Sequence, residues 1–87
     1  MRNILFLKLR KVQYDITVSA TVQLIHDTER NSYSLLAIIG DNGKLVASAE
    51  RPYSSYEAAM REFGTTLELA TTQAYSHALF KREKLQL

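Results

Sequence analysis

The chain of 87 residues contains no cysteine, one proline and three glycines. Without cysteine it has no disulfide framework, no thiolate zinc site and no thiol nucleophile. The glycines form no phosphate-binding loop, because Gly40 and Gly43 fall in a predicted hairpin and Gly64 falls in a predicted helix. No apolar run approaches the roughly 18 residues that a membrane span needs. These absences favour a cytoplasmic protein that does not enter a membrane and uses no thiol chemistry.

The composition, 46% hydrophobic and 23% charged, is that of an ordinary globular protein, and we expect a single domain over residues 1–87. Charge is unevenly distributed along the chain. Residues 1–11 and 81–87 carry seven of the eleven basic residues and one acid, whereas residues 12–80 carry four basic and eight acidic residues. If the two ends lie together, they form a modest cationic patch.

The longest regular pattern is an alternation of apolar or small and polar side chains. The even positions from 12 to 24 hold Val12, Tyr14, Ile16, Val18, Ala20, Val22 and Leu24, and the odd positions between them are polar. A period of two is typical of a strand with one face on a core and one in water. The pattern predicts one long strand over residues 12–26, which bends or carries a bulge because of its length.

Three further strands are predicted on either side of it. Residues 4–9 are nearly all apolar, but their alternation is out of step with the even series, which implies a bulge or bend at Arg10 and Lys11. Residues 33–40 and 45–51 flank Asn42 and Gly43, a strong hairpin signal. Pro52 ends the last strand, because proline cannot donate to a ladder.

A long helix over about residues 55–80 is predicted next. Ser54 and Glu57 have the spacing of a capping box. The apolar stripe alternates steps of four and three and keeps its phase across Gly64: Tyr56, Met60, Phe63, Leu67, Ala70, Ala74 and then His77 or Ala78. We therefore expect one helix, kinked at most near Gly64. The predicted fold is α+β: a four-stranded antiparallel β-meander with one long C-terminal helix on one face.

One stretch carries a family resemblance. The segment NGKLVASAE at 42–50, followed by Tyr53, Ser54, Ser55 and Ala58, is similar to the hairpin-into-helix unit of small YegP-like bacterial domains. The resemblance covers about a quarter of the chain and rests on turn and cap residues. It implies no chemistry for this chain.

No residue pattern points to catalysis or to a metal. His26 and His77 have no second ligand three or four residues away, and Asp15 is a lone acid on a polar strand face. The capping role of Ser54 and Ser55 accounts for both serines. We expect no enzyme activity, catalytic residue, cofactor, metal or small-molecule substrate.

The chain has more apolar side chains than one helix on one face of a sheet can bury. Leu36 and Ile38 lie opposite the predicted core face of their strand, and Leu69 and Phe80 lie opposite the core stripe of the helix. One interpretation is that the first strand folds over the sheet, or that a tail with Phe80, Leu85 and Leu87 covers its far face. The other interpretation is a contact surface for a partner. It consists of Leu36, Ile38, Leu69, Phe80 and the first strand, with a polar rim of Asp27, Glu29 and Asp41.

We expect a small non-enzymatic protein-binding module, an inhibitor or adaptor that docks on a larger protein or complex. The partner is another protein or a second copy of the chain, which would make a homodimer. In size and architecture the chain resembles stand-alone inhibitors from phages and mobile elements, such as anti-CRISPR proteins. The alternative is single-stranded nucleic-acid binding by the sheet surface and the basic termini. Its candidate residues are Arg2, Lys8, Arg10, Lys11, Tyr53, Lys81 and Arg82.

Overall fold

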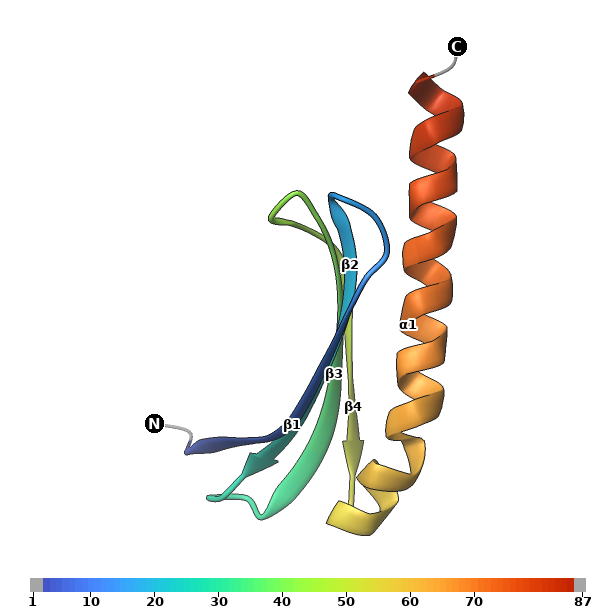
Figure 1. The fold of residues 1–87 in the computed structure, drawn as a ribbon. Coiled ribbons are helices and arrows are strands. Elements are labelled where there is room, and N and C mark those ends of the chain that lie inside the picture. Colours follow the sequence, from blue (N-terminus) through green and yellow to red (C-terminus); the bar gives the residue numbers. More distant parts are fainter. Residues whose placement is uncertain (1–2, 86–87) are drawn as a thin grey trace.

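A computed structural model describes residues 3–85 of the chain, with side chains up to residue 82. Four antiparallel strands form one sheet in the order β1-β2-β3-β4, and one helix packs on one of its faces (Figure 1). The elements are β1 (Ile4–Gln13), β2 (Val18–Asp27), β3 (Ser32–Asp41), β4 (Lys44–Tyr53) and α1 (Tyr56–Leu85). The predicted α+β fold, a meander followed by one long helix, is confirmed.

The core lies between α1 and the two central strands. The alternation along β2 is confirmed from Val18 to Leu24, because Val18, Ala20, Val22 and Leu24 are fully buried and the residues between them are not. On the helix, four of the five buried side chains are alanines, and the fifth is Phe63. Small side chains let a helix approach a sheet closely, but they do not extend sideways over neighbouring strands. The core is therefore narrow and centred on β2 and β3.

The prediction of a single strand over residues 12–26 is wrong, because residues 14–17 form a turn between β1 and β2. The side chain of Asp15 causes this turn: its Oδ1 accepts hydrogen bonds from the backbone N–H groups of Thr17 and Val18, both at 2.8 Å. Such Asx turns compete with extended backbone. Ile16, which the alternation places in the core, is 98% exposed at the tip.

The predicted irregularity of the first strand lies elsewhere. The register of β1 against β2 shifts between Phe6 and Lys8, so the bulge is at Leu7 and not at Arg10 and Lys11. After the bulge, the even residues of β1 pair with the buried residues of β2, and the odd residues lie on the far face. A bulge thus separates an apolar first half of β1 from a basic second half.

The structure shows the turn after β3 and the start of the helix in detail. Asn42 and Gly43 have φ angles of 55° and 80°, as a type I′ turn requires. The helix N-cap is Ser55 rather than Ser54, because the Ser55 hydroxyl accepts a hydrogen bond from the N–H of Ala58 at 3.1 Å. α1 continues through Gly64 without interruption.

The helix covers only part of the sheet. It packs on β2 and β3 and makes few contacts with β4. A helix with its side chains is about 10 Å wide, whereas four strands spaced about 4.8 Å apart span roughly 19 Å. Nearly every residue of β1 and β4 is therefore exposed.

Candidate protein-binding surface

The face of the sheet that α1 does not cover is called the outer face here. The strand registers align residues of neighbouring strands in rows across it, for example Leu9, Gln23, Leu36 and Glu50. Its members, strand by strand, are Ile4, Phe6, Leu9, Lys11 and Gln13; Ser19, Thr21, Gln23 and Ile25; Ser34, Leu36, Ile38 and Gly40; and Leu45, Ser48, Glu50 and Pro52. Figure 1 shows this face turned away from the helix.

Apolar side chains form two strips on the outer face. One runs along β1, where Phe6 is 66% exposed and Leu9 is 53% exposed. The other runs along β3, where Leu36 and Ile38 are half-buried. Between them β2 presents neutral polar side chains, including Thr21 and Gln23. Uncovered apolar side chains grouped in this way are typical of association sites in soluble proteins.

The first half of β1 is apolar on both faces and exposed on both. Leu5 and Leu7 add to the outer-face residues of the same strand, and each is more than two-fifths exposed. The basic second half begins with Lys8, whose Nζ lies 4.6 Å from the centre of the Phe63 ring, a cation–π contact. Neither a folded-over strand nor a covering tail buries this edge within residues 3–82.

A shallow hollow of about 470 Å³ lies at one end of the outer face. The turn between β1 and β2 and the hairpin between β3 and β4 form its walls. Lys11, Ile16, Ile38 and Leu45 are among its lining residues. It is open, it mixes apolar and cationic groups, and it continues the outer face rather than forming a separate pocket.

The residues predicted to contact a partner are not brought together. Leu36 and Ile38 lie on the outer face, as predicted, whereas Leu69 and Phe80 lie on α1, in the other layer. Leu69 and Phe80 are 62% and 61% exposed. Leu69 lines a groove between α1 and β4 with Leu35 and Ala49. Neither Leu69 nor Phe80 lies on the outer face with Leu36 and Ile38, so a single flat partner cannot contact all four.

The predicted acidic rim is also divided. Asp27 is only 3% exposed, and its Oδ1 accepts hydrogen bonds from the N–H groups of Glu29 and Arg30 at 3.1 and 3.3 Å. It closes the turn between β2 and β3 and presents almost no surface to a partner. Glu29 is exposed in the same turn, and Asp41 lies at the opposite end of the sheet.

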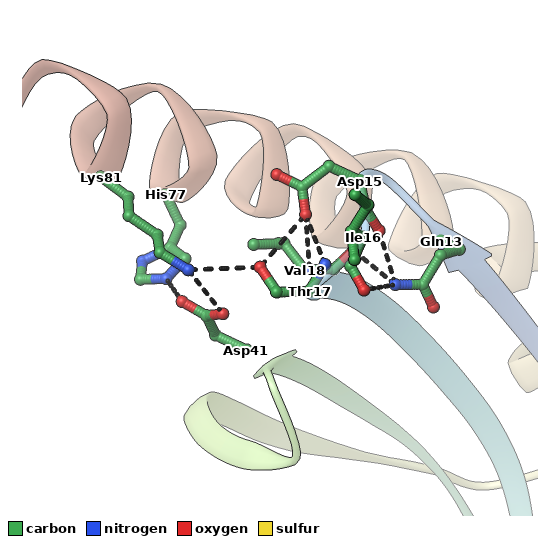
Figure 2. A network of polar contacts seen from close by, with 8 residues as sticks. All are labelled: Gln13, Asp15, Ile16, Thr17, Val18, Asp41, His77 and Lys81. Carbon is green, nitrogen blue, oxygen red and sulfur yellow. Dashed lines mark hydrogen bonds and ion pairs between the residues drawn. The ribbon is translucent and has the colours of Figure 1, made fainter. Parts of the chain in front are cut away.

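Asp41 belongs to a polar network that joins α1 to two turns (Figure 2). Its carboxylate lies 2.9 Å from Nε2 of His77 and accepts a hydrogen bond from Nζ of Lys81 at 3.1 Å. Lys81 also donates to the Thr17 hydroxyl at 3.2 Å. The hydrogen bond from His77, followed by that from Lys81, lowers the pKa of Asp41 to about 2. The network is a structural clip, because all four groups are engaged with one another.

The candidate nucleic-acid residues fall into separate places. Lys8, Arg10 and Lys11 lie along β1, but Lys81 is held by Asp41 and Tyr53 packs against the core. Arg82 is exposed near the end of α1. The backbone hydrogen bonds from Val18 and Thr17 lower the pKa of Asp15, and the charge of Arg82 adds a smaller effect in the same direction. Arg2 lies outside the described residues. At the outer-face positions of residues 4–53, Lys11 is the one basic side chain and Phe6 is the one aromatic side chain.

The two histidines have local partners. His26 stacks on Tyr33 with ring centres 4.3 Å apart, and His77 belongs to the clip. No group of three or more His, Cys, Asp or Glu side chains in the described part of the chain is placed to hold a metal ion.

No helix within the described residues is both long and apolar enough to cross a membrane. No protein-family model, curated protein or solved structure matches this chain.

Proposed function

We propose that this chain is a small non-enzymatic protein-binding module that docks through its outer face and the adjoining edge strand β1. The observation that carries the proposal is the exposure of the apolar side chains of β1, with Phe6 the most exposed of them. These residues contribute nothing to the core between α1 and the central strands. A contact surface gives them a physical role.

Energetics favour a covered outer face. Moving a fully exposed Leu or Phe side chain out of water stabilises an association by about 1.5–3 kcal/mol. The open edge of β1 also presents unpaired backbone N–H and C=O groups, a template for strand addition. Burying Phe6 and Leu9 against a partner would therefore supply a substantial part of the binding free energy.

A module of this kind acts by occupying a surface of another protein, as inhibitors and adaptors do. We expect it to work in the cytoplasm, since a cysteine-free chain suits a reducing compartment. Its size and two-layer architecture are those of phage and mobile-element inhibitors, which supports that class by analogy of architecture alone.

The test is a comparison of Phe6→Asp with Leu69→Asp as the matched control. Both replace an exposed apolar side chain, with exposures of 66% and 62%, so neither is expected to change the free energy of unfolding by more than about 0.5 kcal/mol. The readouts are the molar mass of the pure protein by light scattering and the proteins it retains from an extract of its own source cells. We expect Phe6→Asp to abolish association and Leu69→Asp to preserve it.

Circular dichroism on both variants verifies that they remain folded. The proposal is wrong if folded Phe6→Asp associates as the unmodified protein does. It is equally wrong if Leu69→Asp alone loses association, because the contact would then lie on α1.

A further inference from the structure

We propose that the protein seated on the outer face is a second copy of this chain, packed face to face about a two-fold axis that runs along β2. This inference rests on the proposed function, because it names the partner that the same surface binds. The arrangement of apolar, polar and charged side chains on the outer face carries it.

The apolar strips are placed symmetrically on either side of β2. Leu9 on β1 and Leu36 on β3 both lie in the row of Gln23. A two-fold rotation about an axis along β2 keeps each row in place and exchanges the two sides. Leu9 of one copy then lies over Leu36 of the second copy, and the reverse contact forms at the same time. In this row an apolar side chain meets an apolar side chain on both sides of the axis. In the row of Thr21, Ile38 lies over Lys11 of the second copy, and in the row of Ile25, Phe6 lies over Ser34.

The polar centre is also compatible with its own copy. Gln23 lies on the axis and therefore faces Gln23 of the second copy. An amide side chain both donates and accepts hydrogen bonds, so two of them satisfy each other. Thr21, one row away on the same strand, has a hydroxyl with the same dual capacity. A buried polar stripe of this kind costs little when its members pair.

Charge selects this axis over one that runs across the strands. At the outer-face positions of residues 4–53, the exposed charged side chains are Lys11, on the β1 edge, and Glu50, on the β4 edge. An axis across the strands would keep Lys11 and Lys11 of the second copy on the same side of the interface, with each Glu50 on the other side. The axis along β2 brings Lys11 toward the side of the second copy that bears Glu50, so that opposite charges approach.

The available area suits a stable dimer. Four strands of ten residues give the outer face a planar area on the order of 600 Å², from strand spacings of about 4.8 Å and a rise of about 3.3 Å per residue. One partner contributes about 800 Å² of accessible surface to an interface of standard size. Because side chains make the accessible surface larger than the planar area, the outer face alone is sufficient.

Cysteine cross-linking tests the geometry directly, since the chain has no cysteine of its own. Gln23→Cys is treated with a short bifunctional maleimide, and so is an equal mixture of Leu9→Cys and Leu36→Cys. Leu69→Cys, on the exposed side of α1, is the matched control. We expect the mass of the unmodified protein by light scattering to be twice that of one chain. We expect most of the Gln23→Cys protein to become a covalent dimer, the mixture to give a dimer of one Leu9→Cys and one Leu36→Cys chain, and Leu69→Cys to remain largely uncoupled.

Each other outcome overturns the inference. The inference is wrong if the protein is monomeric at all concentrations. It is also wrong if the protein is a dimer that couples through Leu69→Cys but not through Gln23→Cys. A second experiment distinguishes failure of this inference from failure of the proposed function. The source-cell extract is added to the same cysteine variants before coupling. If Gln23→Cys then couples to a different protein, the outer face binds a partner that is not a second copy, and the proposed function stands. If no protein couples to any sheet position, both fail.

Discussion

Asp41 joins three segments that are distant in the sequence, and its role could not be read from its neighbours. It lies next to the Asn42 and Gly43 turn, where an acid is an ordinary choice. Its partners His77 and Lys81 are 36 and 40 residues away. The predicted role as part of a solvent-exposed rim overlooks them, because only the folded chain brings the end of α1 to this turn. The i, i+4 spacing of the two partners on the helix was the available signal.

The clip makes stability depend on pH in the acid range. The pKa of Asp41 is about 2 in the folded protein against an ordinary value of 3.8, so the unfolded chain binds its proton first as pH falls. The stability that Asp41 contributes is therefore complete above about pH 4 and is lost as pH falls toward 2. We expect the Tm of the unmodified protein to fall more steeply over this window than that of Asp41→Asn, as measured by circular dichroism.

The matched control for that measurement is Glu29→Gln, which removes an exposed carboxylate in the turn at the other end of the sheet. Its profile is expected to follow that of the unmodified protein. Parallel profiles for Asp41→Asn and the unmodified protein would show that the carboxylate is not engaged by His77 and Lys81 in solution.

A second contrast at the residue scale concerns two glycines that differ only in backbone conformation. Gly43 has a φ of 80°, and an added Cβ at Gly64 or at Gly43 meets no atom within 4 Å. We expect Gly43→Ala to destabilise the protein by about 1–2 kcal/mol, because an L side chain strains this region. Gly64→Ala should stabilise it by about 0.5–1 kcal/mol through helix propensity. Urea unfolding of both variants checks the opposite signs, and equal signs would contradict the assignment of the turn.

At the scale of elements, pattern reasoning succeeded where burial decides and failed where one side chain redirects the backbone. The bounds predicted for β3, β4 and α1 agree with the structure within a few residues, because core faces set the periods of β3 and α1 and the Asn42 and Gly43 turn sets the start of β4. The predicted strand over residues 12–26 merges the end of β1, the turn at residues 14–17 and β2. Tyr14 packs against Tyr75 and Ile16 is exposed, so both continue the even series without belonging to a strand. Asp15, taken as a lone solvated acid, was the turn signal.

The same reasoning predicted an excess of apolar side chains but not the surface that bears it. Sequence periodicity shows which residues lie opposite the core, yet Leu36 on β3 and Leu69 on α1 satisfy that criterion equally. They separate only when the layers are assembled, which places Leu36 on the outer face and Leu69 in a groove between α1 and β4. The width of α1 relative to the sheet then decides that β1, rather than a central strand, is left exposed.

At the scale of the whole molecule, the two functional hypotheses differ in their response to salt. The three cations of β1, Lys8, Arg10 and Lys11, could neutralise at most about three phosphates, which would give single-stranded nucleic acid a log–log salt slope of about −2. Such binding is weak at physiological ionic strength, and the outer face offers one aromatic side chain, Phe6, for stacking. We expect a labelled single-stranded oligonucleotide to show no change in fluorescence anisotropy at physiological salt, and Arg10→Glu combined with Lys11→Glu to leave this result unchanged. Arg51→Glu combined with Arg61→Glu, at exposed sites on β4 and α1, changes the net charge by the same amount and is the control. If the unmodified protein binds the oligonucleotide, the double variant does not and the control does, then β1 is a nucleic-acid interface. Only a contact with Arg10 and Lys11 distinguishes the double variant from the control.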